Sequence, residues 1–232
     1  MRRRMSRAFT LVEMLVVIGI VSVLASLLIP TLSHARSTAR CVNCLNNLRQ
    51  WGFACSMYMN DHGGYIPRRG QGTRELKIIT RDSDWFNCLP PYVGEQPYRI
   101  LVEQGKQPKA GDKSLFICPS ATDSDGAFFM PYAMNMYLSP WVRPEPHNIA
   151  EIPEPTKVVF MADAPGPFSA TVPSARAFSV EPRHRGHANV VFLDGHVKSF
   201  SREYLGCGIC DPKRHDVCWH TGSEGINQPP LD

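Results

Sequence analysis

Two groups of side chains in the C-terminal part of the chain have the composition of a transition-metal site. The first combines three imidazoles with a carboxylate: His184, His187, Asp194 and His196. The second combines thiols with an imidazole: Cys207, Cys210, His215 and Cys218. Imidazole, thiolate and carboxylate are the ligands that zinc and related metals take in proteins.

Simpler structural roles account better for both groups. Asp194-Gly195 separates two apolar runs, Asn189–Leu193 and His196–Phe200, which predicts a β-hairpin with a two-residue turn. Side chains alternate faces in a hairpin, so we interpret Asp194 as a turn residue and expect His184 to donate to a carbonyl or to Asp194. Cysteines of an oxidising compartment form disulfides more often than zinc sites. We therefore expect no metal and no cofactor, and keep both groups as a less favoured alternative.

Catalysis is not predicted either, because no Ser-His-Asp order, nucleophile elbow or pair of carboxylates stands out. Bulk charge does not favour nucleic acid. The chain has 25 Lys+Arg against 21 Asp+Glu, and four of the basic residues lie in the first eight positions. The remaining chain is electrically balanced and offers no basic surface by composition.

The elements that position these residues start with an apolar run from Leu11 to Ile29, in which Glu13 is the only charged residue. Nineteen such residues can cross a membrane as a helix. Four arginines precede the run (Arg2, Arg3, Arg4 and Arg7), which predicts a cytoplasmic N-terminus and export of everything after Pro30. A cleaved signal peptide and a plain anchor are competing interpretations. The run is longer than a usual signal-peptide core, and a carboxylate in a membrane segment usually has a partner.

After Pro30 the sequence predicts a second helical stretch, from Thr31 to about Asn60. Its apolar stripe recurs every three or four residues and marks the core face: Cys41, Cys44, Leu48, Trp51, Cys55 and Tyr58. All eight cysteines lie beyond the apolar run: Cys41, Cys44, Cys55, Cys88, Cys118, Cys207, Cys210 and Cys218. An even number in an exported domain predicts disulfides, with the pairing left open.

Residues 65–155 are rich in proline and predict a loop-rich region. Within it we expect a short helix to start in Asp82–Asn87. We also expect Phe116–Ser120, followed by Tyr132–Asn135, to form an exposed loop with aromatic anchors. A buried strand is predicted for Lys157–Ala162, and another near Ala177–Val180.

The segment Ala8-Phe9-Thr10-Leu11-Val12-Glu13 resembles the processing site of type IV prepilins and type II secretion pseudopilins. In that family a basic leader is removed, the new N-terminal Phe is methylated, and a Glu at the fifth mature position pairs with the terminal amine of a neighbouring subunit. The resemblance implies a cut between Ala8 and Phe9, methylation of Phe9 and an assembly role for Glu13. It also aligns Pro30 with a proline that the family often has, where a kink or local unwinding is expected. Ala8 departs from the family, which usually has Gly before the cut.

A second resemblance lies further along the chain, and the matching blocks together span most of it from Phe9 to Phe200. His184, nine intervening residues and Asp194-Gly195 resemble the prepilin-type processing-associated His-x9-Asp-Gly domain. The blocks Cys44–Gln50 and Phe116–Ser120 are similar as well. The resemblance implies a pilin-like protein with a large exported head.

The sequence thus predicts a pilin-like α+β fold: a long N-terminal helix packed on a C-terminal antiparallel sheet, with a loop-rich insertion. The expected parts are a leader (1–8), an assembly helix (9–30), a helix packing on the head (31–64), a variable region (65–155), a sheet with the hairpin (156–206) and a Cys/His-rich tail (207–232).

The expected function is that of a structural filament subunit in a type II secretion pseudopilus or type IV pilus-like filament, and not that of an enzyme. Its expected partners are a prepilin peptidase, other pilin subunits and the inner membrane, which it crosses once with the head periplasmic or extracellular. Two alternatives stay open: an anchored binding module using exposed aromatics such as Trp141, and a metal-dependent enzyme using the histidine group.

Overall fold

The computed structural model describes residues 10–70, 81–121, 130–139, 145–165, 171–172, 180–205 and 216–219. The chain divides into two compact units, Met1–Ala39 and Arg40–Asp232. The first is the N-terminal part of one long helix, and the second is the head.

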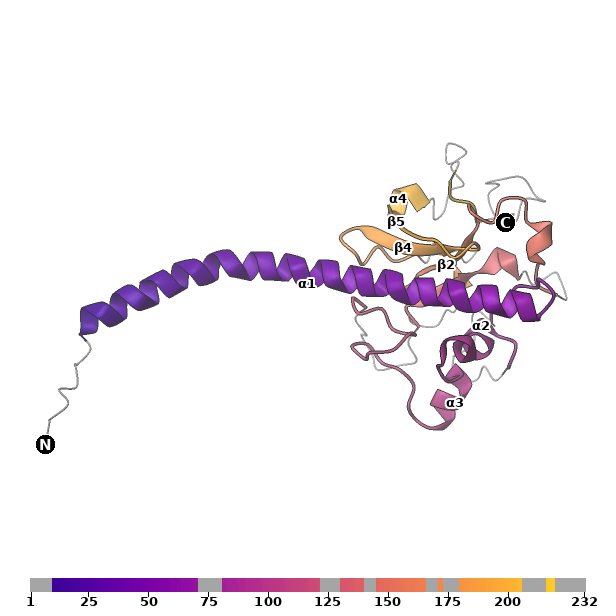
Figure 1. The fold of residues 1–232 in the computed structure, drawn as a ribbon, viewed down its shortest axis with the longest axis horizontal. Helices are drawn as coiled ribbons and strands as arrows, with labels where there is room; N and C mark the ends of the chain where they lie inside the picture. The colour runs from indigo at the N-terminus through magenta and orange to yellow at the C-terminus, as the bar shows by residue number, and fades with distance from the viewer. Residues whose placement is uncertain are drawn as a thin grey trace, which may run out of the picture. The chain divides into compact units, whose positions relative to one another are not determined.

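Helix α1 runs without interruption over Leu11–Asp61 and belongs to both units (Figure 1). The predicted helix from Thr31 to about Asn60 is therefore confirmed as the second part of α1. Pro30 lies inside the continuous helix, so of the two effects expected there the local unwinding is not found, and the kink stays a prediction. The helix ends at Gly63 and Gly64, both of which have positive φ, and Gly64 N–H donates to the Met59 carbonyl.

The head is built on a sheet with the strand order β3-β1-β2-β4-β5. Its strands are β1 (Tyr132–Asn135), β2 (Val159–Asp163), β3 (Thr171–Val172), β4 (His187–Phe192) and β5 (Val197–Ser201). Strands β1, β2, β4 and β5 pair antiparallel, and the two-residue β3 pairs parallel with β1. The predicted hairpin is confirmed as β4–β5, and the predicted strand at Lys157–Ala162 corresponds to β2. The expected two-residue turn is wrong, because four residues, 193–196, separate β4 from β5, and Gly195 N–H donates to the Phe192 carbonyl. Most of the strand expected near Ala177–Val180 lies outside the described residues.

Both faces of this sheet are covered. On one face Met134, Met161 and Val191 pack in a cluster with Leu48 and Trp51 of α1. On the other face Ala162, Val190 and Phe200 join a second cluster, which includes Leu205 and Trp219 near the end of the described chain: Ala133, Val159, Ala162, Ala164, Val180, Ala188, Val190, Phe192, Phe200, Leu205, Val217 and Trp219. Strands buried on both sides have nearly continuous apolar sequences, as in Val158–Ala162.

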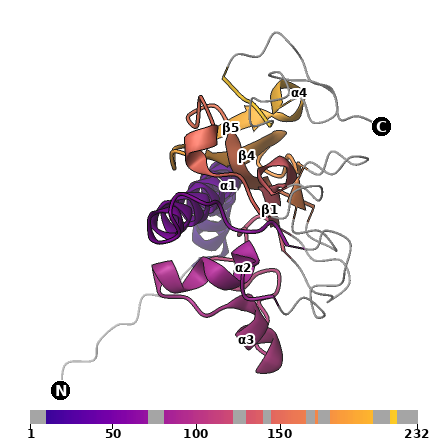
Figure 2. The same cartoon turned by 90° about the vertical axis from the view of Figure 1, so that its right-hand side faces the viewer.

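Short helices complete the head: α2 (Trp85–Cys88), η2 (Pro90–Val93), α3 (Tyr98–Glu103), η3 (Met136–Leu138), η4 (Ile149–Glu151) and α4 (Arg202–Leu205). The C-terminal part of α1 passes between the sheet on one side and α2 and α3 on the other (Figures 1 and 2). Trp51 of α1 makes edge contacts with Trp85 of α2 and with Phe116, at centroid distances of 5.2 and 5.3 Å. The helix therefore forms the centre of the head.

The expectation of an exposed loop is wrong for both of its segments. In Phe116–Ser120, the side chains of Phe116, Ile117 and Cys118 are buried. The second segment is Tyr132–Asn135. These residues form the fully buried strand β1, between β2 and β3. A four-residue run with a tyrosine and an asparagine has no alternating pattern and resembles a loop by composition. Burial of Asn135 is possible because its side chain bonds three backbone groups: it donates to the Val159 and Trp219 carbonyls and accepts from Tyr137 N–H. The α+β architecture, with the long helix on an antiparallel sheet, is nevertheless confirmed.

Candidate functional site

The N-terminal end of α1 is closed by a reciprocal pair of hydrogen bonds between Thr10 and Glu13. Glu13 N–H donates to Thr10 Oγ1 at 3.2 Å, and Thr10 N–H donates to Glu13 Oε2 at 2.8 Å. The Thr10 hydroxyl donates to the same Oε2 at 2.7 Å. This is a capping box, which satisfies backbone donors at the start of a helix. The carboxylate that the resemblance assigns to assembly thus has a partner within its own chain.

The helix that follows exposes its large apolar side chains. Helix α1 is long and apolar enough to cross a membrane. It is the only helix with this property in the described part of the chain. Exposed residues include Leu15, Ile18 and Leu28, each more than half exposed. Serine hydroxyls along it bond back to the helix, as Ser22 does to the Ile18 carbonyl, so the surface offers few free polar groups. Such a surface fits a hydrocarbon environment or the packed core of a bundle.

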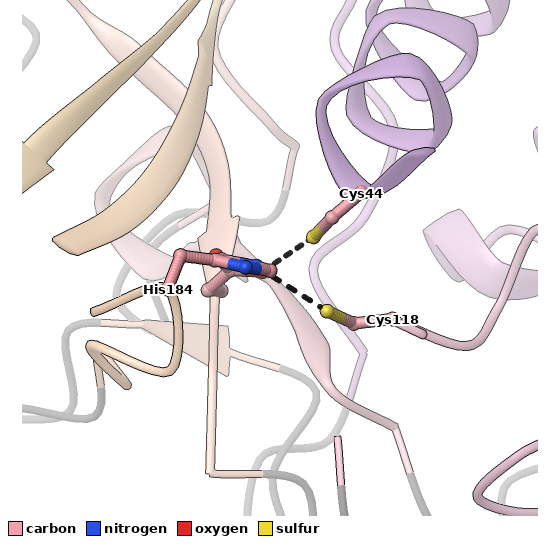
Figure 3. Close-up of side chains that lie close together, drawn as sticks. Cys44, Cys118 and His184 are labelled. Carbon is pink, nitrogen blue, oxygen red and sulfur yellow. Dashed lines mark hydrogen bonds and ion pairs between the residues drawn. The ribbon is translucent and has the colours of Figure 1, made fainter. Parts of the chain in front are cut away.

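A second site lies inside the head, where four polar side chains from separate segments converge: Cys44, Cys118, Asp163 and His184. Cys44 is on α1, Cys118 follows the Leu115–Ile117 turn, Asp163 ends β2, and His184 precedes β4. Figure 3 shows the two sulfurs and the imidazole directed toward one another. Cys44, Cys118 and Asp163 are fully buried, and His184 is 6% exposed.

The contacts within this cluster are short. Cys44 Sγ lies 3.1 Å from Asp163 Oδ1, and Cys118 Sγ lies 3.4 Å from His184 Nε2. The same His184 Nε2 lies 3.4 Å from Asp163 Oδ2. One donor atom from each of the four residues lies within 4.8 Å of every other. The cluster therefore surrounds a single point.

An outer layer of hydrogen bonds holds these side chains in place. The Tyr132 hydroxyl donates to Cys44 Sγ at 3.3 Å, and Asn47 Nδ2 donates to the Tyr132 oxygen at 3.3 Å. Asn189 N–H donates to Asp163 Oδ2 at 2.8 Å. The guanidinium of Arg183 lies 3.8 Å from Asp163 Oδ1 and is itself nearly buried. The side chains of Cys44 and Asp163 are thus oriented by partners outside the cluster as well as within it.

The pKa values of the two thiols in the cluster are shifted in opposite directions. A hydrogen bond from Cys44, together with His184, lowers the pKa of Cys118 to about 6 despite its burial. Burial raises the pKa of Cys44 well above its usual range. Burial opposes protonation of His184, but its contacts with Asp163 and Cys118 raise its pKa to about 10. The two shifts favour a thiolate on Cys118 beside a protonated His184.

A cysteine–histidine pair also occurs in cysteine hydrolases, but the geometry here differs. In those sites one imidazole nitrogen faces the nucleophile and the other is held by an orienting group. Here Cys118 and Asp163 both contact Nε2 of His184. Since the sulfur is also fully buried, a substrate has no route to it in this conformation. The arrangement fits ligation or structural pairing, and not nucleophilic catalysis.

The residues singled out from the sequence have different locations. The histidines predicted as a less favoured metal group do not converge: His196 Nδ1 bonds Asp194 Oδ1 at 2.6 Å and stacks on Phe192, while His187 is exposed. His184 contacts Cys118 and Asp163, and not Asp194 or a carbonyl as expected.

The expected disulfides are not found among the cysteines that the structure describes. Six are free thiols: Cys41, Cys44, Cys55, Cys88, Cys118 and Cys218. Cys207, Cys210 and His215, Trp141, and the processing residues Ala8 and Phe9, lie outside the described residues.

A long apolar helix that continues into the centre of an antiparallel α+β head defines a pilin-like protein. Comparison with known proteins agrees. Residues 33–172 match a family described as "Protein of unknown function (DUF1559)", and residues 3–29 match the prokaryotic N-terminal methylation motif. The chain is 34% identical over 116 residues to the type II secretion system core protein G of Klebsiella michiganensis, covering 50% of this chain and 76% of that protein. No solved structure matches the chain. The chain belongs to the DUF1559 family and is a pilin-like protein related to the type II secretion pseudopilins.

Proposed function

We propose that this pilin-like subunit is assembled into a type II secretion pseudopilus or a closely related type IV pilus-like filament. The observation that carries the proposal is the apolar, exposed N-terminal part of α1 with Glu13 as its single charge, in a chain that matches the methylation motif. The similarity to the core protein G of Klebsiella michiganensis supports the type II secretion machinery over other filaments. The role is structural, and no catalysis is required of the head.

Processing and orientation follow from the same segment. A prepilin peptidase cuts between Ala8 and Phe9, and Phe9 is then methylated. The basic leader keeps the N-terminus cytoplasmic, so the head from about residue 31 is exported across the inner membrane. Asp194 and Gly195 serve the hairpin turn, and the parts of the chain outside the helix form one exported head.

The assembly role of Glu13 requires its carboxylate to leave one partner for another. In the single chain Thr10 holds Glu13 Oε2 through two hydrogen bonds. In a filament the terminal ammonium of a neighbouring Phe9 replaces them, since a carboxylate pairs more strongly with an ammonium in a low-dielectric environment than with the uncharged donors of Thr10. The pair then sets the axial offset between neighbouring helices.

Two variants separate the assembly role of Glu13 from its capping role. Glu13→Gln keeps a side chain that can still accept from Thr10 but removes the charge. Thr10→Val removes the hydroxyl and keeps the charge. We expect both mature proteins to be cleaved and methylated, as read from the N-terminal peptide by mass spectrometry. Glu13→Gln should abolish filament assembly and Thr10→Val should retain it, as measured by shearing and sedimentation of filaments from cells that overproduce the subunit.

Two results would overturn the proposal. A mature chain that still begins near Met1 would leave a simple membrane anchor. Assembly that is retained in Glu13→Gln and lost in Thr10→Val would mean that Glu13 acts as a helix cap and not between subunits.

A further inference from the structure

We propose that Cys44, Cys118, Asp163 and His184 form a closed, four-coordinate site for a divalent transition metal, and that Zn²⁺ is the ion it takes. The site is independent of the filament proposal, because it lies wholly within the head. Its role is structural: it joins α1 to the sheet and to the loop that carries Cys118.

The spacing of the donor atoms has the size of a zinc tetrahedron. With Zn–S bonds of about 2.3 Å and Zn–N or Zn–O bonds of about 2.0–2.1 Å, neighbouring ligand atoms lie about 3.3–3.8 Å apart. The measured separations are 3.1 Å for Cys44 Sγ to Asp163 Oδ1, 3.4 Å for Cys118 Sγ to His184 Nε2, and 3.4 Å for His184 Nε2 to Asp163 Oδ2. All remaining separations are within 4.8 Å. The first and third of these distances involve different oxygens of the Asp163 carboxylate. An ion can therefore enter with side-chain shifts of up to about 1 Å.

The donor set selects the ion. Two thiolates disfavour magnesium and calcium, which take oxygen ligands. A carboxylate and an imidazole beside the thiolates fit Zn²⁺ better than Cu⁺, which prefers sulfur. Four protein ligands leave no open position for water or substrate, which is the property of a structural zinc site. Full burial of Cys44, Cys118 and Asp163 agrees with that role.

The charges around the site also balance. Two thiolates and one carboxylate around Zn²⁺ leave one net negative charge, because a ligating imidazole is neutral. Arg183, 3.8 Å from Asp163 Oδ1 and nearly buried, supplies the compensating positive charge. Tyr132 and the Asn189 amide donate to Cys44 Sγ and Asp163 Oδ2, as outer groups commonly do to anionic metal ligands.

A Cys44–Cys118 disulfide is the competing arrangement in an oxidising compartment, and one contact argues against it. Cys44 Sγ lies 3.1 Å from Asp163 Oδ1, a buried carboxylate oxygen. A thiol can donate there, and a metal can bridge the two atoms. A disulfide sulfur has no proton to donate, so its lone pairs would face those of the carboxylate at that distance.

The direct test is the metal content of the full-length protein, purified from membranes in detergent without a metal-affinity step. We expect about one zinc ion per chain by inductively coupled plasma mass spectrometry. The protein is then denatured in the presence of a chelator and an alkylating agent, digested and analysed by mass spectrometry. Cys44 and Cys118 should both be alkylated, which shows that they were not oxidised.

Matched variants locate the ion. Cys118→Ser and Asp163→Asn should lose zinc, whereas Cys41→Ser, which changes a neighbouring thiol on the same helix, should keep it. A Cys207→Ser/Cys210→Ser double variant should also keep it, which separates this site from the Cys/His-rich tail. Because ligand variants can misfold, the wild-type protein provides a second readout. Replacement of zinc by Co²⁺ should give the sulfur-to-cobalt charge-transfer absorption and intense visible bands of a tetrahedral thiolate site.

Three results would overturn the proposal. One is a disulfide-linked peptide containing Cys44 and Cys118. Another is reduced protein that binds neither Zn²⁺ nor Co²⁺ from a metal-buffered solution. The third is zinc that is lost in the tail variant and retained in Cys118→Ser.

Discussion

Gly52 of α1 lies directly against Gly195, the glycine of the Asp194-Gly195 pair in the turn between β4 and β5. A Cβ placed on Gly52 would be 3.1 Å from Gly195 Cα and 2.7 Å from Val191 Cγ2. Gly195 has φ of +87°, so it provides both the turn and the space for the helix. The Asp-Gly pair that predicts the hairpin is therefore also a packing surface for α1.

We expect Gly52→Ala to destabilise the head by about 1–3 kcal/mol, because the helix and hairpin must separate to admit the methyl group. Alanine is otherwise favoured over glycine in a helix. Gly19→Ala is the matched control in the same helix, since nothing lies within 4 Å of its added Cβ. Denaturant unfolding in detergent measures both. Equal stability of Gly52→Ala and wild type would contradict this close contact.

Stability should depend on Asp84, which is 1% exposed and has no hydrogen-bond partner for either carboxylate oxygen. Burial raises its pKa to about 6, against an opposing effect of Arg81 and Arg68. The folded state therefore holds a proton that the unfolded chain releases near its ordinary pKa of 3.8. Stability contributed by this group is full below pH 4 and falls as the pH rises toward 6.

Asp84→Asn removes that loss. We expect it to stabilise the protein at pH 7 by roughly 1–3 kcal/mol, with a gain that disappears toward pH 4. Unfolding at several pH values measures the difference. A gain that is the same at pH 4 and pH 7 would mean that the Asp84 carboxyl does not titrate between them.

Asn135 should be far more sensitive to substitution than Asn148, although their side chains make similar bonds. Asn135 Nδ2 donates to the Val159 and Trp219 carbonyls at 2.8 Å each, and the residue is fully buried. Asn135→Ala leaves these buried acceptors without that donor and should cost about 2–4 kcal/mol. Asn148, which is half-buried, donates to the Gly63 carbonyl, and water can replace it in Asn148→Ala at a cost below about 1 kcal/mol. Thermal unfolding of the pair checks this ordering.

Replacement by leucine should strongly destabilise the protein at Trp51 of α1 and have little effect on its stability at Phe53 of the same helix. Trp51 is fully buried between Trp85 and Phe116 and donates its indole N–H to the Leu115 carbonyl. Trp51→Leu should cost about 2–4 kcal/mol through the cavity and the lost hydrogen bond. Phe53 is 60% exposed, and Phe53→Leu should stay within about 0.5 kcal/mol of wild type. A comparable loss in both variants would show that Phe53 is covered in the folded protein.

The elements that could be predicted from the sequence are those with a periodic or turn signal. The stripe from Cys44 to Tyr58 identifies the core face of α1, and Asp194-Gly195 identifies the hairpin. Strand β1 could not be predicted, because its four residues are buried on both faces and carry no alternation. Its position depends on pairing with β2, which is distant in sequence.

The buried cluster of Cys44, Cys118, Asp163 and His184 could not be predicted from the sequence for a different reason. Cys44, Cys118 and His184 each lie in a stretch that the family resemblance picks out, yet nothing in their spacing indicates that they meet. Asp163 carries no signal except its place at the end of a buried strand, where a carboxylate needs a partner. Short-range metal motifs have ligands a few residues apart, whereas these four are brought together only by the packing of α1 on the sheet.

Helix α1 has its first fully buried side chain at Cys44, only a few residues after the N-terminal unit ends at Ala39. In a filament, tension along the helix enters the folded head at that residue. Cys44 is held there by Asp163 of β2 and by the hydroxyl of Tyr132 in β1. A pulling force is therefore passed at once to two strands of the sheet in parallel. Mechanical detachment of α1 from the sheet would break the half-buried contact of Cys41 with Asn189 first and the buried contact of Cys44 with Asp163 next.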